Sequence, residues 1–156
     1  GNSPYDRFVN GDKTALNASQ ARGFNIFFKK VACDSCHLGF NFTDGSFENI
    51  GIGMDKKNPD LGRFVVTGKD SDKGSFKVPS LREIENTGPY MHDGRFKTLE
   101  AVVEHYDKGG IKNPNLDSRL KPLKMTSQNK KDLVAFLKAL SGEGWQHIKS
   151  PKAFPK

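Results

Sequence analysis

Long apolar runs are missing from this chain of 156 residues, and none approaches the roughly 18 residues that a membrane-spanning helix needs. The N-terminus also lacks the basic and apolar stretches of a secretory signal peptide, so we expect that a leader was removed or that the chain was cut from a longer one. Hydrophobic residues make up only 35% of the chain, and the mean hydropathy is −0.65. This low apolar content predicts one domain whose modest core is completed by a large apolar ligand.

Clusters of arginine and lysine with aromatic residues between them, which are typical of nucleic-acid-binding proteins, are also missing. The net charge of +7 comes mostly from lysines that are spread along the chain. This pattern argues against nucleic acid as a partner. It favours a charged surface that keeps the protein in solution and steers an acidic partner.

Cysteine is rare as well, and its placement is the most informative feature of the chain. Cys33 and Cys36 lie in the stretch VACDSCHLGF, and His37 follows directly. The pattern C-x-x-C-H is typical of c-type haem attachment, because two thiols at this spacing add to the two vinyl groups of haem and the next histidine reaches the iron. The sequence therefore predicts one covalent haem c, with His37 as the proximal iron ligand.

Three other interpretations of this motif compete with haem attachment. A structural zinc site needs four ligands, and the chain has no second pair of Cys or His at a matching spacing. A thioredoxin-like redox site needs a βαβ context, which the sequence does not indicate. A disulfide between Cys33 and Cys36 is compatible with an oxidising compartment. Haem is favoured because it also accounts for the thin core.

The sixth iron ligand is not selected by spacing alone. Its identity matters, because a thioether favours Fe(II) and raises the reduction potential, whereas a tyrosinate favours Fe(III) and lowers it. The candidates are Met54, Met91, Met125, His92, His105, His147 and Tyr106. Ordinary packing or a solvated position explains each of them equally well.

Apolar periodicity and capping residues predict three helices, over 15–30, 98–110 and 126–142. Their expected N-caps are Asn17 or Ser19, Thr98 and Thr126. The first helix leads directly into the C-x-x-C-H motif. The last helix carries the clearest apolar stripe and is expected to end at Gly142.

The expected fold class is mainly α, a cytochrome c-like single domain with long loops around one covalent haem c. Residues 38–75 are rich in Gly, Asp, Asn and Lys and indicate such loops, within which 62–68 is expected to form a short strand. The haem domain is expected to span residues 1–142. Residues 143–156 are expected to form a loosely attached C-terminal extension.

The first and last helices are expected to cross, as they do in a cytochrome c fold. Gly23 would allow the two backbones to approach closely. Phe27 would then face Leu133 and Leu137 across the crossing.

Several motifs beyond C-x-x-C-H make a family resemblance specific. The segments that carry it are SPYDRFVNGD, RGFNIFFKKVACDSCHLGFNFTDGSFENIG, DLGRFVVTG and FKVPSLREIENTGPYMHDGRFKTLEAVVEHYDKGG. Together they cover most of residues 3–142 and resemble the C-terminal haem domain of the bacterial di-haem cytochrome c peroxidase and MauG family. The segments corresponding to the family's other, peroxide-binding haem domain have no counterpart in this chain.

The resemblance implies roles for individual residues. In the family the distal ligand lies on the helix after the PYxHxG motif. This position corresponds to Tyr106, as in MauG-like members, with Met91 or Met54 as alternatives. His92 matches the family histidine near this haem and is the candidate catalytic residue, although a loop-anchoring role explains it equally well.

The resemblance also implies a calcium ion between the two domains of the family. Backbone carbonyl groups that match Thr87 and Pro89 would contribute to it, since a hard cation prefers oxygen ligands. The remaining ligands would come from the domain that is absent here. One departure from the family pattern is Glu83, which stands where an asparagine often follows the LR pair.

The function implied by the resemblance is a haem c electron-transfer domain of a di-haem peroxidase or MauG-like oxidoreductase. Such a domain relays electrons to or from a peroxide-reacting haem, and its expected partners are a small redox protein and a second haem domain or chain. The single C-x-x-C-H motif supports the alternative of a stand-alone monohaem electron carrier without substrate turnover. Because haem c is attached outside the cytoplasm, the expected location is the periplasm.

Overall fold

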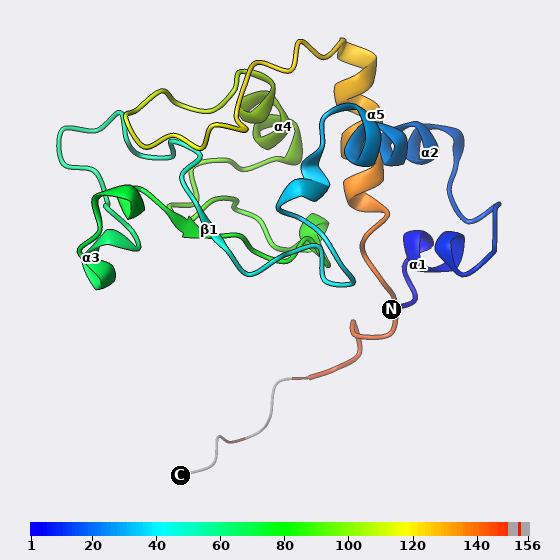
Figure 1. Cartoon of the computed structure of the whole chain (residues 1–156). Helices are drawn as coiled ribbons and strands as arrows, with labels where there is room; N and C mark the ends of the chain where they lie inside the picture. The colour runs from blue at the N-terminus through cyan, green and yellow to red at the C-terminus, as the bar shows by residue number, and fades with distance from the viewer. Residues whose placement is uncertain (150–152, 154–156) are drawn as a thin grey trace.

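The structure is a computed structural model that describes residues 1–149 and 153. In chain order its elements are α1 (Pro4–Val9), α2 (Ala18–Asn25), a π-helical turn (Ile26–Lys30), a 3-10 turn (Cys33–Ser35), β1 (Phe47–Glu48), α3 (Phe64–Thr67), a 3-10 turn (Asp70–Asp72), β2 (Phe76–Lys77), a 3-10 turn (Ile84–Asn86), α4 (Leu99–Asp107) and α5 (Ser127–Lys138). The fold is therefore small and mainly helical, and β1 and β2 form one short antiparallel pair. Figure 1 shows α2 lying across α5, with α3 and β1 on the other side of the molecule. Within the described residues, none of the helices has the length and apolar character needed to cross a bilayer.

The crossing of α2 and α5 lies at the centre of the core. Gly23 sits where the helices touch, and a methyl group on it would collide with the carbonyl oxygen of Asp132 and lie 2.6 Å from Cβ of Phe136. Phe27 and Phe136 are almost fully buried, with ring centroids 5.3 Å apart, and they share one buried cluster with Leu133. The prediction that Gly23 permits a close crossing is confirmed.

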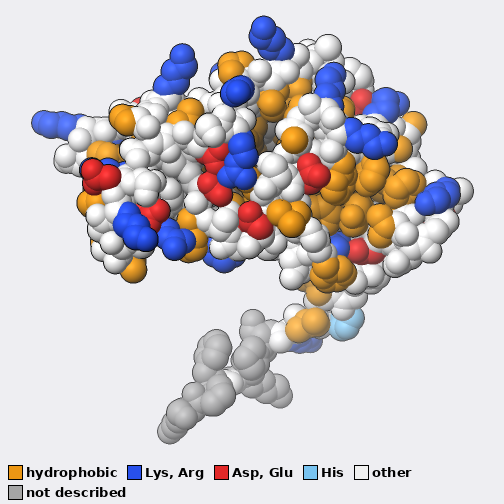
Figure 2. All heavy atoms as spheres, viewed as in Figure 1, with side chains coloured by type: hydrophobic (Ala, Val, Ile, Leu, Met, Phe, Trp, Pro, Cys, Tyr) orange, Lys and Arg blue, Asp and Glu red, His pale blue; other side chains and the backbone are white. Residues whose placement is uncertain are grey.

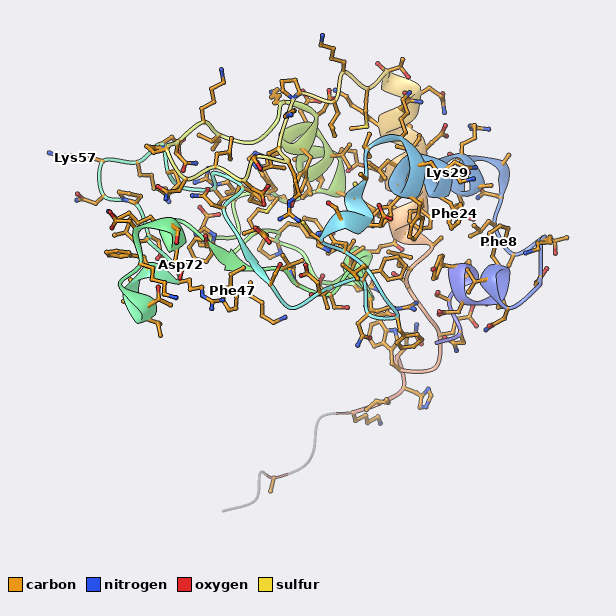
Figure 3. The ribbon with its side chains drawn as sticks, in the orientation of Figure 1. Phe8, Phe24, Lys29, Phe47, Lys57 and Asp72 are labelled. Atoms are coloured by element: carbon orange, nitrogen blue, oxygen red, sulfur yellow. The ribbon has the colours of Figure 1, made fainter. Side chains whose placement is uncertain are left out.

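Aromatic side chains extend this core to α1. Phe8 of α1 and Phe24 of α2 point toward one another in Figure 3, with ring centroids 5.6 Å apart in an edge-to-face arrangement. Tyr5 lies edge-on against Phe42 at 5.0 Å and against Phe136 at 5.9 Å. Such pairs add roughly 0.5–1.5 kcal/mol beyond the burial of their area. The N-terminal helix is thereby held against the helix crossing.

The helices begin at the capping residues that the sequence predicts. The side chains of Asn17, Thr98 and Thr126 each accept a hydrogen bond from the backbone N–H three residues further on. Of the two caps considered for the first helix, Asn17 is therefore the one used. Ser19 instead donates to the carboxylate of Asp132 at 2.6 Å.

Several expected elements differ from the structure. The first helix begins only at Ala18 and becomes a π-helical turn at Ile26, and the second ends at Asp107. The segment 62–68 was expected to be a strand, and this prediction is wrong, because Phe64–Thr67 form the helical turn α3. Gly62 and Gly68, with φ of 56° and 65°, turn the chain at both ends and leave too few residues between them for a paired strand. The last helix also ends earlier than predicted, at Lys138 instead of Gly142.

A buried carboxylate ties the two crossing helices together. The Asp132 side chain is 1% exposed and accepts hydrogen bonds from Arg22 Nε at 2.7 Å, from Ser19 Oγ and from Gln128 Nε2. The hydrogen bond from Arg22 contributes most to holding the pKa of Asp132 far below its ordinary value, against the opposing effect of burial. The carboxylate is therefore charged and fully partnered in the folded protein.

Acid is expected to destabilise the protein partly through Asp132. A carboxylate whose pKa is lowered by folding stabilises the native state above its unfolded pKa of roughly 4, and this contribution is lost as the pH falls toward its folded pKa. In Asp132→Asn the free energy of unfolding at pH 7 should fall by about 1–3 kcal/mol. Below pH 4 the stability of this variant should decrease less with falling pH than that of the native protein. Urea denaturation between neutral and acidic pH measures both effects. The matched control Asp70→Asn removes a carboxylate that is 85% exposed and should leave the pH profile unchanged.

Candidate functional site

A large cavity lies between the helices and the C-x-x-C-H turn. Its volume is about 860 Å³, within the range of roughly 300–1,000 Å³ that is usual for ligand and cofactor sites. Its walls come from α4 and α5, from the turn that contains residues 31–37, from β2 and the segment after it, and from residues 117–125. Most of the side chains that line it are apolar. The thin core expected from the composition therefore surrounds a space large enough for a cofactor.

Both thiols of the motif face this cavity. A 3-10 turn over Cys33–Ser35 brings both cysteines to the same wall of the cavity. The turn is closed by a hydrogen bond that the backbone N–H of His37 donates to the Cys33 carbonyl at 3.0 Å. The two cysteines are not bonded to each other. Burial raises the pKa of the Cys33 thiol to about 12, which is opposite to the shift that activates a catalytic thiol.

His37 presents one ring nitrogen to the protein and leaves the other available. Its Nδ1 lies 3.0 Å from the carbonyl oxygen of Phe42, which can only accept a hydrogen bond, so Nδ1 carries the proton. The lone pair of the neutral ring is then on Nε2, the arrangement that suits a metal ligand. Burial lowers the pKa of His37 and keeps the ring neutral, although the carbonyl groups of Phe42 and Pro79 oppose this shift.

Tyr106, near the end of α4, lines the same cavity. Among the described residues no hydrogen bond involves its hydroxyl group, and the side chain is partly buried where it borders the cavity. Burial raises the pKa of Tyr106 well above its ordinary value, and the nearby thiols of Cys33 and Cys36 add to the shift. A cation inside the cavity would satisfy this oxygen.

The other sixth-ligand candidates separate into two groups. Met91, His92 and Met125 line the cavity, whereas Met54, His105 and His147 do not. His105 Nε2 is 3.0 Å from the Ile50 carbonyl, the side chain of Met54 lies beside Gly74, and His147 is exposed. The ring of His92 stacks on Phe76 with centroids 3.5 Å apart, and burial lowers its pKa.

Of the two residues expected to bind calcium, one borders the cavity and the other does not. Thr87 lines it, and its hydroxyl donates to the Ile84 carbonyl at 3.4 Å, while Pro89 lies outside the lining. Across the described part of the chain, no group of three or more His, Cys, Asp or Glu side chains is placed to hold a metal ion. The same observation leaves the C-x-x-C-H thiols without the partners that a zinc site needs.

One feature of the site has almost no signature in the sequence. An ion-pair cluster of Glu48, Asp117 and Arg119 borders the cavity beside the C-x-x-C-H turn. The departure at Glu83 also has a structural explanation, because its carboxylate accepts hydrogen bonds from the backbone N–H of Gly142 and from Trp145 Nε1. Only the D-x-R spacing of residues 117–119 hints at the cluster, and this spacing is common in ordinary turns.

The chemistry of the donor set fits a haem. The cavity is apolar and large, two unpaired thiols lie on one wall, and the ring of His37 offers Nε2. Tyr106 supplies an unpartnered oxygen in the same cavity. No other part of the described chain gathers such a set of donors.

Comparison with known proteins finds relatives of this chain. No family model matches the chain. It is 45% identical over 145 residues to the methylamine utilization protein MauG of Methylorubrum extorquens, and 37% identical over 147 residues to the cytochrome c551 peroxidase of Nitrosomonas europaea. These matches cover 92% and 90% of the chain but only 40% of each relative.

A solved structure shows the same relationship in three dimensions. A MauG-like protein associated with microbial copper homeostasis aligns with a TM-score of 0.83 and 33% identity, over 91% of this chain and 49% of that one. The small, mainly helical fold is thus that of the MauG-like di-haem peroxidases. The chain belongs to the MauG and di-haem cytochrome c peroxidase family. It spans less than half the length of these relatives.

Proposed function

We propose that this chain is the haem c electron-transfer domain of a di-haem cytochrome c peroxidase or MauG-like oxidoreductase. It would relay electrons to or from a peroxide-reacting haem carried by another domain or chain. The observation that carries the proposal is the single cavity that brings together Cys33, Cys36, His37 and Tyr106 in a member of this family. We assign the haem domain to residues 1–142 and leave residues 143–156 as an extension.

Four residues of this chain would hold the cofactor, each through a different atom. Cys33 and Cys36 would attach haem through thioethers, His37 would ligate the iron through Nε2, and Tyr106 would supply a further ligand through its hydroxyl oxygen. When bound, haem supplies one-electron Fe(III)/Fe(II) chemistry. His92 lies at the edge of this site, stacked on Phe76, and is the remaining candidate for a role in the reaction.

The same assignment leads to a proposed location and proposed partners for this domain. Thioether attachment would place the protein in the periplasm, where a small redox protein would exchange electrons with it. Figure 2 shows Lys and Arg side chains scattered over the visible face, so we expect this binding to weaken as salt is added. Calcium would bind the carbonyl groups of Thr87 and Pro89 only with further ligands from a second domain.

Replacing Tyr106 by methionine is expected to raise the reduction potential, because a thioether stabilises Fe(II) and a tyrosinate stabilises Fe(III). At a fixed potential the Fe(II)/Fe(III) ratio should rise on the order of a hundredfold or more. The variant should also gain the weak absorption band at the red end of the spectrum that marks Met ligation. Met91→Leu is the matched control, since Met91 also lines the cavity. A native protein that already has this band and loses it in Met91→Leu would identify Met91 as the ligand.

The alternative function, a stand-alone monohaem electron carrier, is favoured by the single C-x-x-C-H motif. Hydrogen peroxide tests whether this chain needs a second haem for turnover. We expect the reduced, purified chain to show little or no catalytic peroxide reduction when a reduced small cytochrome is supplied as donor. Donor oxidation measured with and without peroxide gives the rate. Sustained peroxide-dependent turnover by the single-haem chain would refute the relay assignment.

A further inference from the structure

The ion-pair cluster beside the C-x-x-C-H turn has no role in the function proposed so far. We call it the Arg119 cluster, and it consists of Glu48, Asp117 and Arg119. Arg119 Nη2 lies 2.8 Å from Glu48 Oε1, and Arg119 Nε lies 3.0 Å from Asp117 Oδ1. Arg119 Nη1 also donates to the Ser35 carbonyl at 3.3 Å. One guanidinium group therefore joins the haem-attachment turn to two segments that are distant in sequence.

The cluster lies between solvent and the cavity. Side-chain exposure falls from 42% for Arg119 to 23% for Glu48 and 9% for Asp117, and all three residues line the cavity. Neighbouring residues also hold the two acidic members in place. Ser46 Oγ donates to Glu48 Oε1 at 3.0 Å, and the Asp117 N–H donates to the Asn49 carbonyl at 2.9 Å. The charges are thus fixed in place beside the cavity.

All three charged residues line the same cavity as the two haem-attachment residues, Cys33 and Cys36. Two negative charges and one positive charge leave a net negative cluster. Its electrostatic effect on this edge of the cavity therefore depends on Arg119 being present.

We propose that Arg119 is a positioning residue that fixes the haem-attachment turn through Ser35 and neutralises Glu48 and Asp117 beside the haem, so that the cluster sets the reduction potential. The inference rests on the proposed function, because it requires haem in this cavity. Negative charge near the iron stabilises Fe(III) relative to Fe(II) and lowers the potential. Without Arg119, two unneutralised carboxylates would border the site.

Redox titration of the haem-loaded protein, followed by absorbance, tests this role without any assay of enzyme turnover. Arg119→Gln is expected to raise the Fe(III)/Fe(II) ratio at a fixed potential by roughly fivefold. Adding Asp117→Asn in the same chain should reverse part of this shift. Asp117→Asn alone, with Arg119 retained, should shift the ratio in the opposite direction. The matched control is Arg63→Gln, which removes an arginine that pairs with Asp72 and does not line the cavity.

The outcomes separate the inference from the function on which it rests. A native protein without covalent haem refutes the proposed function. Full haem content with an unchanged potential in Arg119→Gln, or a shift that Asp117→Asn does not reverse, overturns the role of Arg119. If Arg119→Gln does not fold, the reduction potential of Asp117→Asn tests the inference instead. An unchanged potential in Asp117→Asn also overturns the role of Arg119.

Discussion

Replacing Cys33 and Cys36 together by alanine is expected to abolish covalent pigment in this protein, even when haem is abundant during expression. The double variant removes both thiol groups on the cavity wall, and the chain has no other cysteine. His37 would still offer Nε2, so any remaining haem would be bound without a covalent link. Haem staining after denaturing electrophoresis should therefore fall from full intensity to none.

Single variants and a neighbouring control make this test specific. Cys33→Ala and Cys36→Ala each leave one thiol able to form a thioether, so we expect reduced but detectable staining. Ser35→Ala changes one of the two residues between them, leaves both thiol groups in place and should stain fully. Pigment that resists denaturation in the double variant would contradict the assignment of the attachment site.

The second large effect is expected at the helix crossing. Gly23→Val places a branched side chain where even a methyl group would collide with the Asp132 carbonyl oxygen and approach Phe136 Cβ to 2.6 Å. Since backbone atoms cannot rotate away, α2 and α5 must separate, and the free energy of unfolding should fall by about 3 kcal/mol or more. Because α5 also lines the cavity, we expect a parallel loss of haem loading.

Gly23→Ala gives a sharper version of the same test. Alanine is favoured over glycine within a helix by roughly 1 kcal/mol, so helix propensity alone predicts a stabilised protein. We expect destabilisation instead, measured by urea denaturation. Asn25→Ala, at an exposed position of the same helix, is the control and should change stability little. A Gly23→Ala protein as stable as the native one would show that α2 and α5 pack less closely than in the structure.

Sequence patterns predict the helical part of this fold because local chemistry determines it. Side-chain caps at Asn17, Thr98 and Thr126 satisfy N–H groups of the first helical turn, and such signals are readable residue by residue. Gly23 was likewise recognisable, since a glycine inside an apolar helix suggests a close contact. The C-x-x-C-H motif and the family resemblance directed attention to Tyr106, which the structure places in the same cavity.

Other features depend on contacts that the sequence does not display. The run Phe64–Thr67 has strand-forming residues, yet two glycines with positive φ fold it into a helical turn with Val65 and Val66 exposed. The Arg119 cluster joins segments that are more than 60 residues apart, so no local sequence pattern predicts it. Residue spacing alone leaves His105 among the sixth-ligand candidates, and only the structure shows that its ring nitrogen is hydrogen-bonded to a backbone carbonyl outside the cavity.

The intact mass of the native protein, measured after denaturation, tests the central claim most directly. Covalent attachment through both sulfurs predicts a mass equal to that of the polypeptide plus one haem, and the same value after treatment with a reductant. A mass equal to the bare polypeptide, or one lighter by the two hydrogen atoms lost in a Cys33–Cys36 disulfide, would contradict it.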